Sequence, residues 1–555
     1  MNLQDELSKF ITGEVQSDDV TLATYSHDAS LFEVKPQVVV FPESAMEVQK
    51  VVKWVAEQKA LNPELSITAR SAGTDMSGGP LNESIILDFT KYINRIISVD
   101  TERGIVEPGC YYRDFEKETL KLGRLMPAYT ASKEICAMGG MVANNSGGEK
   151  SIKYGKVENY VRWQKVIFSD GNAYEVKPLN QEELKLKMEQ NDFEGYVYKK
   201  LFKLIEANYD AIQAAKPKVN KNSAGYYLWN VWDRETGVFD LNKLLVGAQG
   251  TLALTTEIEF GLVPVQKHSR MVVVFMNDIE RLGGLVDTVM QFKPESLESY
   301  DDYSMKLAIK FAFDFFKQLG FFGALKLGFQ FIPDMLKVIT GGVPKLIMMV
   351  EITGDDEEAL YARCVEIQKA IAPFNYQSRI AGSKAEVEKY WKIRRESFNL
   401  LRKHVKGKRT APFIDDIVVT PHDLPKFFPE LQKILGEYKL IYTIAGHAGN
   451  GNFHIIPLMD LDNPLSADVI LELSDKVYRL VAQYGGSTTA EHNDGIIRTP
   501  YLSYIFNTEI INLFAEVKRI FDPQNIFNPG KKVGGSFDYI RTHLIKSDRK
   551  VAHGS

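Results

Sequence analysis

The sequence of 555 residues is poor in cysteine. Cys110, Cys136 and Cys364 are the only three, and no two of them form a C-x-x-C pair. A disulfide scaffold, a zinc ribbon and a self-contained iron–sulfur cluster all need more cysteines at closer spacing. The cysteine content therefore excludes these three classes of site and predicts a reducing compartment.

Long apolar runs and an excess of basic residues are also missing. No window reaches the ~20 uninterrupted apolar residues of a membrane-spanning helix. The polar, acidic start of the chain lacks the apolar core of a signal peptide. With 67 basic and 72 acidic side chains the net charge is −5, unlike that of a nucleic-acid-binding protein. We predict a cytoplasmic protein that does not bind nucleic acid.

Neither common nucleotide-binding motif is present. The absence of G-x-G-x-x-G after a strand disfavours a Rossmann NAD site, and the absence of G-x-x-x-x-G-K-[ST] excludes a Walker loop. Two other glycine-rich loops, 70–80 and 138–148, each follow a predicted strand. Small residues let the backbone approach a ligand closely, and the loop N–H groups with the Thr74 and Ser77 hydroxyls can bind a pyrophosphate. For the first loop alone, an ordinary tight turn is an equal alternative.

The order of apolar runs and helical patterns predicts the fold class. In the first half, short apolar runs alternate with a helical pattern, which is typical of an α/β or α+β domain. Its predicted strands cover 36–42, 65–70 and 84–89, and its first long helix covers 44–60. After a break near 263–270, further apolar strands predict a second α+β domain, and they cover 271–276, 346–354 and 440–447.

Residues 306–337 form an unusual stretch that holds eight Phe, five Lys and two Asp. A long aromatic, amphipathic and basic segment can lie in a lipid headgroup layer. The alternative is a pair of helices that packs on the second domain or on another subunit. Both interpretations stay open at this point.

Two histidines flank a turn signal in Gly446–His454. If Asn450 and Gly451 form a two-residue type I′ turn, His447 lies opposite His454, with Cβ atoms ~5 Å apart. Two imidazoles on one face can share a divalent metal. A wider loop would still bring them together, and two packing histidines are the alternative.

A third metal ligand is suggested further along the chain. Glu491 offers a hard carboxylate oxygen, and the next residue, His492, is a base near physiological pH. Two histidines and one carboxylate leave coordination positions open, as a catalytic metal site requires. Without further information, an exposed Glu–His pair is the alternative interpretation.

Four segments of this sequence occur in an order that resembles a known flavin domain. They are R-S-A-G-T-D-M-S-G, P-A-Y-T-A-S-K-E-I-C-A-M-G-G-M-V-A-N-N-S-G-G, Y-G-K-V and V-G-A-Q-G-T-L. The resemblance is to the vanillyl-alcohol oxidase/p-cresol methylhydroxylase (PCMH) superfamily, and it extends from about Gln37 to Lys532. It implies an α+β protein with a two-subdomain FAD-binding domain, an α+β cap or substrate domain, and a C-terminal tail that contacts the flavin. The expected boundaries are 1–265 with a split near 95–105, 266–515 and 516–555.

The same resemblance implies which residues hold FAD. Those expected at the cofactor are Ser71, Ala72, Gly73, Thr74, Asp75, Ser77, Gly78, Pro127, Gly139, Gly140, Asn144, Ser146, Gly147, Tyr154, Gly155, Gly250 and Asn528. Some members of the superfamily attach the flavin through a histidine of the first loop. No histidine lies between 70 and 80, so non-covalent FAD is expected.

The histidine segments resemble one branch of this superfamily. G-H-A-G-N-G-N-F-H and A-E-H-N-D-G are similar to segments of D-lactate dehydrogenases, glycolate oxidase flavoprotein subunits and D-2-hydroxyglutarate dehydrogenases. The resemblance implies a divalent metal (Zn, Mn or Fe) on His447, His454 and Glu491, with His492 as the catalytic base. Asn450, where Asp is common, and Asn493-Asp494-Gly495 depart from the branch pattern.

Two further residues are carried over from this branch as candidates. Arg394 completes a W-x-x-R segment and is expected to hold the substrate carboxylate, with an ordinary arginine on a surface helix as the alternative. Tyr226 ends K-N-S-A-G-Y and is expected either to hydrogen-bond substrate or to pack in the core.

The resemblance implies a FAD-dependent dehydrogenase, rather than an oxidase, that converts a D-2-hydroxy acid to the 2-oxo acid. The acids at 412–416, where D-2-hydroxyglutarate enzymes place a lysine, favour D-lactate. Glycolate or D-2-hydroxyglutarate oxidation, alkylglycerone-phosphate synthase-like chemistry and a non-catalytic flavoprotein subunit are the alternatives. The expected electron acceptor is a quinone or a separate iron–sulfur or electron-transfer protein. A homodimer, and contact of 306–337 with the inner face of the plasma membrane, are further expectations.

Overall fold

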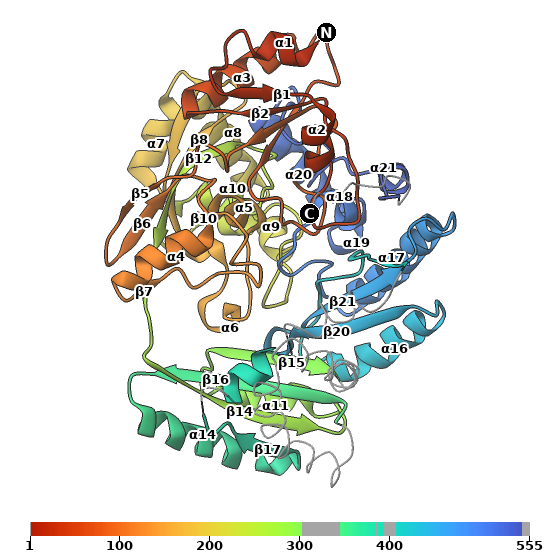
Figure 1. Cartoon of the computed structure of the whole chain (residues 1–555). Coiled ribbons are helices and arrows are strands. Elements are labelled where there is room, and N and C mark those ends of the chain that lie inside the picture. The colour runs from red at the N-terminus through yellow and green to blue at the C-terminus, as the bar shows by residue number, and fades with distance from the viewer. Residues whose placement is uncertain (1, 302–343, 384–385, 393, 395–406, 547–555) are drawn as a thin grey trace.

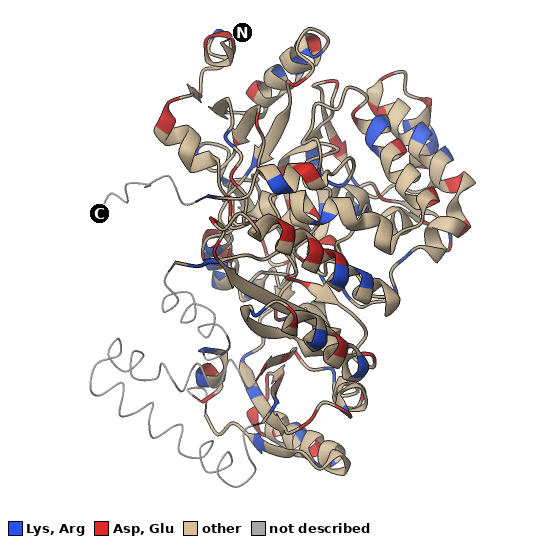
Figure 2. Ribbon diagram, turned by 90° about the vertical axis from the view of Figure 1, so that its right-hand side faces the viewer, with Lys and Arg blue, Asp and Glu red and all other residues tan. Residues whose placement is uncertain are grey.

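The computed structural model describes residues 2–301, 344–383, 386–392, 394 and 407–546. The Phe- and Lys-rich stretch 306–337 lies outside these residues, so neither interpretation of it is tested. Figure 1 shows two lobes: the N-terminal half and the end of the chain form one, and the segments between them form the other. Acidic and basic residues are interspersed along the helices of both lobes (Figure 2).

The first part of the N-terminal lobe is a four-stranded sheet. Its strand order is β1 (Glu14–Gln16), β2 (Val38–Phe41), β4 (Ile85–Asp88), β3 (Ile67–Arg70). The last three strands are parallel and fully or largely buried, as their continuous apolar runs predict. The helices of this part are α1 (Leu3–Leu7), α2 (Asp19–Tyr25) and α3 (Ala45–Gln58), and α3 packs its valines on the sheet.

The second part of this lobe is an antiparallel sheet of five strands. Their order is β5 (Ile96–Val99), β6 (Arg103–Val106), β12 (Leu254–Gly261), β8 (Val161–Ile167), β9 (Ala173–Val176). Shorter strands form two pairs, β7 (Arg124–Leu125) with β13 (Val263–Pro264) and β10 (Trp232–Asp233) with β11 (Val238–Phe239). The helices are α4 (Tyr112–Lys121), α5 (Met138–Asn144), α6 (Ser151–Tyr154), α7 (Gln181–Glu189), α8 (Phe193–Ala207), α9 (Tyr209–Ala214) and α10 (Asn242–Leu245).

The C-terminal lobe is built on one large antiparallel sheet. Its order is β17 (Gln377–Ile380), β14 (His268–Met276), β16 (Leu346–Gly354), β15 (Ser296–Asp301), β20 (Ile441–His447), β21 (Asn452–Met459), β18 (Arg409–Thr410), and β19 (Ile417–Val418) also pairs with β21. Helices α11 (Leu282–Met290), α14 (Glu357–Ile371), α16 (Leu424–Gly436) and α17 (Ser466–Gln483) share its main core. On the other face, Tyr390 and Trp391 pack against alternate residues of β14 and β16.

The end of the chain returns to the N-terminal lobe. Its helices are α18 (Gly495–Arg498), α19 (Leu502–Ile505), α20 (Thr508–Phe521) and α21 (Phe537–Thr542). Residues 502–521 share a core with α8, and Phe527 bridges to Ile67 of the first sheet. The expected boundary between 515 and 516 falls within α20. Among the described residues, no helix has the length and apolar character needed to cross a bilayer.

Candidate functional site

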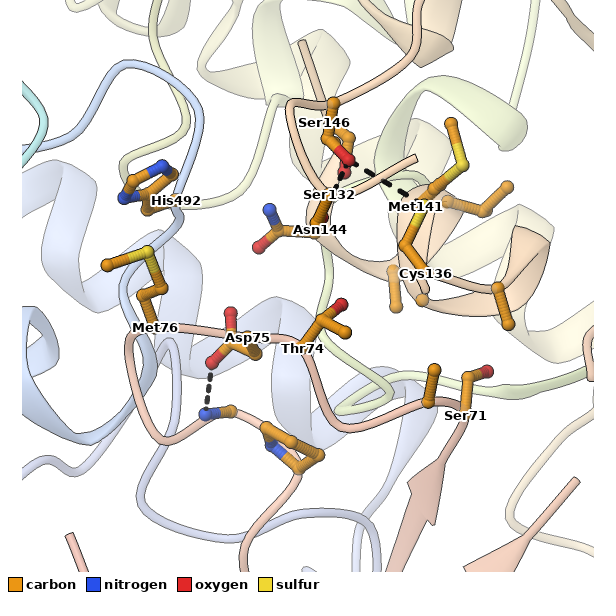
Figure 3. A pocket seen from close by; sticks show the side chains of 18 of the residues that line it. Ser71, Thr74, Asp75, Met76, Ser132, Cys136, Met141, Asn144, Ser146 and His492 are labelled. Atoms are coloured by element: carbon orange, nitrogen blue, oxygen red, sulfur yellow. Dashed lines mark hydrogen bonds between the residues drawn. The ribbon is translucent and has the colours of Figure 1, made fainter. Parts of the chain in front are cut away.

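A cavity of about 710 Å³ lies where the two lobes meet. One part, here called the loop end, is lined by residues within 71–80, 135–149 and 245–255 of the N-terminal lobe. The other part, the histidine end, is lined by Arg394, His447, His454, Glu491 and His492. Figure 3 shows the side chain of His492 across the cavity from Asn144 and Ser146, with Thr74 and Asp75 of the first loop nearby.

The first glycine loop presents backbone donors to the cavity. The N–H groups of Ser77 and Gly79 donate to Asp75, and that of Gly78 donates to Asp28. Among the described residues, the N–H groups of 72–76 have no hydrogen-bond partner. Gly73 has φ +64°, a left-handed conformation that glycine adopts without strain. Successive unpaired N–H groups of this kind form an anion-binding concavity.

The second glycine loop comes close to the histidine end. Gly139 and Gly140 lie in the first turn of α5, and a Cβ atom at Gly139 would lie 2.4 Å from Cβ of Pro108. A Cβ atom at Gly147 would approach an oxygen of Glu491 to 3.1 Å. The two loops therefore need small residues because other parts of the protein already fill the space behind them.

The structure brings most of the expected cofactor residues together. Those that line the cavity are Ser71, Ala72, Gly73, Thr74, Asp75, Gly139, Gly140, Asn144, Ser146, Gly147 and Gly250. Those that do not line it are Ser77, Gly78, Pro127, Tyr154, Gly155 and Asn528. Asn528 acts behind the loops: its side-chain NH₂ donates to the carbonyl oxygens of Gly79 and Gln249, at 2.9 and 2.7 Å. It therefore fastens two segments of the loop end to each other.

The two hairpin histidines are close, but the expected two-residue turn is wrong. In the β20–β21 pair His447 lies opposite Asn452, and Ala445 lies opposite His454. The connection is a short 3-10 turn that ends at Gly451, whose φ is +70°. A register shift of two residues preserves the face of the sheet. His447 and His454 are therefore diagonal neighbours, with ring centroids 5.3 Å apart.

The imidazoles converge on one carboxylate oxygen. Nε2 of His447 lies 2.9 Å from Oε1 of Glu491, and Nε2 of His454 lies 3.2 Å from the same oxygen. Each Nδ1 contacts a different buried carboxylate, that of Glu298 at 2.6 Å and that of Asp415 at 3.0 Å. Carboxylates on Nδ1 orient both rings so that Nε2 points to the shared oxygen.

Burial and charge set the protonation of this cluster. Burial alone would raise the pKa of Glu491, but Lys221 and His447 outweigh it and hold that pKa well below its usual range. Burial alone would lower the pKa of His454, but Asp415 and Glu491 outweigh it and raise the pKa to about 10. The cluster thus keeps its carboxylates ionised and His454 protonated. A bound metal cation would take the place of the proton on His454.

The acids at 415 and 416 do not face a substrate. Both are fully buried. Asp415 lies 2.7 Å from Nδ1 of His492 through one oxygen and 3.0 Å from Nδ1 of His454 through the other. Asp416 accepts hydrogen bonds from the loop that carries Glu491. Both carboxylates are occupied within the protein, so they give no support to the argument for D-lactate.

The two residues carried over from the branch have different outcomes. Arg394 lines the cavity and forms an ion pair with the buried Glu298. Tyr226 lies elsewhere: its hydroxyl contacts Thr251 Oγ1 at 2.6 Å, and its ring packs edge-on against Phe514. In the structure Tyr226 thus packs in the core and does not line the cavity.

Sequence reasoning missed several residues that hold the histidine end. Lys221 is buried, and its Nζ lies 3.3 Å from Oε2 of Glu491. It begins the K-N-S-A-G-Y segment, of which only the last residue, Tyr226, is a sequence candidate for the site. Glu298 lies in β15 within S-L-E-S-Y-D, which carries no recognisable signal. Only the fold brings it to Arg394 and His447.

Comparison with known families identifies the two lobes. Residues 36–177 match the model of an FAD binding domain, and residues 265–532 match the model of the C-terminal domain of FAD linked oxidases. The chain therefore carries an FAD binding domain and the C-terminal domain of FAD linked oxidases, and the resemblance to PCMH-type flavoproteins is confirmed. FAD is the cofactor of the first of these domains.

Individual relatives agree with this assignment. D-2-hydroxyglutarate dehydrogenase of Escherichia coli (strain K12) is 26% identical over 540 residues, which are 95% of this chain and 51% of that protein. The chain thus spans about half the length of this relative. D-lactate dehydrogenase of Archaeoglobus fulgidus is 24% identical, with 96% of this chain and 99% of that protein covered. The solved structure of p-cresol methylhydroxylase has a TM-score of 0.65 at 15% identity and covers 94% of each chain, which shows the shared fold.

Proposed function

We propose that the protein is an FAD-dependent dehydrogenase that oxidises a D-2-hydroxy acid to the 2-oxo acid. The observation that carries this proposal is the convergence of His447 Nε2 and His454 Nε2 on one oxygen of Glu491, at the end of the cavity opposite the first glycine loop. The names of the relatives, which include D-2-hydroxyglutarate and D-lactate dehydrogenases, support the same class of substrate.

A divalent metal fits the donor set of the histidine end. His447, His454 and Glu491 supply two imidazole nitrogens and a carboxylate oxygen, a combination suited to Zn, Mn or Fe. Glu298 and Asp415 occupy the Nδ1 positions of the two histidines, as outer partners do at metal sites. When bound, the metal would supply Lewis acidity that lowers the pKa of the substrate hydroxyl. FAD would supply the hydride acceptor.

The side chains of the chain itself bind the substrate and move its proton. Arg394 binds the substrate carboxylate, and Glu298 fixes its guanidinium through their ion pair. His492 removes the hydroxyl proton at Nε2, because Asp415 holds its Nδ1. Arg394 and His492 both line the cavity, so these groups place the substrate Cα between the histidine end and the loop end.

D-Lactate is our first candidate among the D-2-hydroxy acids. Within the described part of the chain, Arg394 is the one Lys or Arg side chain that lines the cavity. One such cation suits one carboxylate. We propose D-2-hydroxyglutarate and glycolate as the alternatives, because their enzymes belong to the same branch.

The electrons are proposed to leave to a quinone or to a separate iron–sulfur or electron-transfer protein. The protein is proposed to act as a dehydrogenase rather than an oxidase. A cytoplasmic location, a homodimer and contact with the inner face of the plasma membrane through 306–337 complete the proposal.

The test is anaerobic reduction of the bound flavin in a stopped-flow spectrometer. The panel contains D-lactate, L-lactate, glycolate, D-2-hydroxyglutarate and L-2-hydroxyglutarate. We expect bleaching with D-lactate and slow or no bleaching with the L enantiomers. Bleaching by none of the five would contradict the proposal and would favour adduct chemistry like that of alkylglycerone-phosphate synthase, or a subunit without catalysis.

A further inference from the structure

The loop that bears Glu491 and His492 runs from 487 to 494 without helix or regular strand. Two functional side chains therefore depend on a backbone that no ladder of hydrogen bonds orders. We propose that Asp416 is a positioning residue that fixes this loop by presenting one carboxylate oxygen to its backbone. This inference rests on the proposed function only for the roles of Glu491 and His492.

One oxygen of Asp416 receives four donors from the loop. Its Oδ2 accepts hydrogen bonds from the Thr489 hydroxyl at 2.6 Å and from the N–H groups of Ala490, Glu491 and His492 at 2.9, 2.8 and 2.7 Å. Three successive N–H groups that converge on one point form a concavity for an anion. Here the anion is a side chain of the protein, fully buried, so the contacts are strong and little screened.

Asp416 is also close enough to His454 to be considered as a metal ligand. Ligand atoms of Asp416, His454, Glu491 and His492 all lie within 4.8 Å of one another. However, the second oxygen of Asp416 accepts a hydrogen bond from Asn452 Nδ2 at 3.0 Å. Oδ2 thus carries four donors on about two lone-pair sites and has no site left for a metal, and the other oxygen already binds Asn452. The hydrogen bonds therefore assign Asp416 to the backbone of the loop.

The opposite side of the loop is held by the N-terminal lobe. Lys156 Nζ and the Ser223 hydroxyl donate to the carbonyl oxygen of Ala490, at 3.1 and 3.0 Å. Asn144 Nδ2 donates to the carbonyl oxygen of Glu491 at 2.7 Å. The C-terminal lobe thus accepts hydrogen bonds from the N–H groups of the loop through Asp416. The N-terminal lobe donates hydrogen bonds to the carbonyl groups of the loop. The loop spans the junction at which the cofactor and the substrate meet.

Neighbouring carboxylates provide a matched pair of variants. Asp415 contacts the rings of His454 and His492, whereas Asp416 contacts the backbone, and both are fully buried. The full-length, FAD-loaded protein is examined by hydrogen exchange of peptides that cover 488–493. Asp416→Gly removes the carboxylate and suits the φ of +70° at this position. Asp416→Asn keeps an acceptor oxygen, and Asp415→Asn is the control.

We expect Asp416→Gly to speed exchange of the Glu491 and His492 amides by about tenfold or more, because hydrogen bonds to a charged group are lost. The Ala490 amide also donates to the backbone carbonyl oxygen of Asp416 at 3.0 Å, a partner that this variant keeps. Asp416→Asn should restore part of the protection, and Asp415→Asn should leave it unchanged. In Asp416→Asn, kcat should fall while FAD affinity stays as in the wild type.

Unchanged exchange in a folded Asp416→Gly protein would overturn the inference, as would an equal increase in Asp415→Asn. If Asp416→Gly does not fold, the same exchange experiment is done on Thr489→Val, which removes one of the hydrogen-bond donors to Asp416. Exchange as slow as in the wild type would then overturn the inference. Hydrogen exchange needs no substrate. A wild-type protein that oxidises no hydroxy acid would therefore contradict the proposed function but would not change the hydrogen-exchange result for Asp416.

Discussion

The loop end and the histidine end of the cavity are built in opposite ways. At the loop end, residues 72–76, whose N–H groups have no hydrogen-bond partner within the described part of the chain, line the cavity together with a set of glycines. At the histidine end, imidazoles, a carboxylate and Arg394 face it, and buried carboxylates stand behind them. The loop end offers backbone groups to a ligand, and the histidine end offers side-chain groups.

This difference separates the effects of mutations. A backbone site tolerates changes of side-chain chemistry and is sensitive to added volume or to backbone strain. A side-chain site tolerates small changes of volume and is sensitive to the loss of a charge or of a hydrogen bond. Changes at the loop end should therefore alter FAD binding, and changes at the histidine end should alter binding of the proposed metal and the reaction rate. Three variants and one pH titration test whether the two ends are separate in this way.

The largest effect is expected for His492→Asn. Loss of the proposed base should slow flavin reduction about 100- to 10,000-fold, the usual contribution of general base catalysis. FAD content should not change. Stopped-flow reduction by D-lactate measures the rate, and His422→Asn is the control, because that histidine is exposed and pairs with Asp287. A rate near that of the wild type would remove His492 from the reaction.

Glu298→Gln should have the next largest effect. The carboxylate supports both Arg394 and Nδ1 of His447, and loss of such an outer partner costs about 10- to 100-fold in metal affinity or activity. Metal titration of the chelated protein, followed by metal analysis, measures it. Glu295→Gln is the control, since Glu295 pairs with Lys150 and Lys153 instead. Equal metal loss in both variants would count against the assigned role.

At the loop end, Gly73→Ala should weaken FAD binding about tenfold. Without FAD the loop can relax from the left-handed conformation, and restoring it on binding costs a residue with a Cβ roughly 1–2 kcal/mol. The added Cβ would also lie 2.4 Å from Nη2 of Arg70. Metal content should stay constant. Flavin fluorescence on titration of the apoprotein gives the affinity. Gly123→Ala has a similar φ of +65° with no atom within 4 Å, so it reports strain away from the cavity. If both variants bind FAD equally, the role of Gly73 at the cofactor is refuted.

The smallest effect is a pH dependence of FAD retention. Burial and the neighbouring Asp75 raise the pKa of Asp28 to about 7. The pKa of Asp28 is therefore higher in the folded protein than in the unfolded chain. The neutral acid stabilises the folded protein fully below about pH 4, and this stabilisation is lost as the pH rises through about 7. FAD, which carries an anionic pyrophosphate, should bind several-fold less tightly above pH 7. Asp28→Asn should flatten this profile in the same fluorescence titration, and a pH-dependent variant would contradict the prediction.

Local sequence patterns predicted most elements of the fold but not their partners. The strands at 67–70 and 85–88 and the helix at 45–58 follow from apolar spacing and lie where we expected them. The placement of β12 between β6 and β8 depends on contacts more than 80 residues apart along the chain, which periodicity does not encode. The strand signals are local, whereas sheet order is set by the packing of the whole lobe.

The site shows the same division between local and distant information. The glycine loops and the two histidines were recognisable because each occurs in one short segment. Glu298 and Lys221 were not, because they reach His447 and Glu491 from strands and loops far away in the sequence. Asp415 was misinterpreted because a sequence shows that an acid is present but not that two histidines already occupy it.

The central claim is that the three residues His447, His454 and Glu491 bind a metal that substrate oxidation requires beside the flavin. It is tested most directly by anaerobic flavin reduction with D-lactate after chelation, before and after a divalent metal is added back. We expect the chelated protein to keep its FAD and to be bleached only after metal returns, and we expect metal not to rescue His454→Gln. A metal-free protein bleached at the full rate would contradict it.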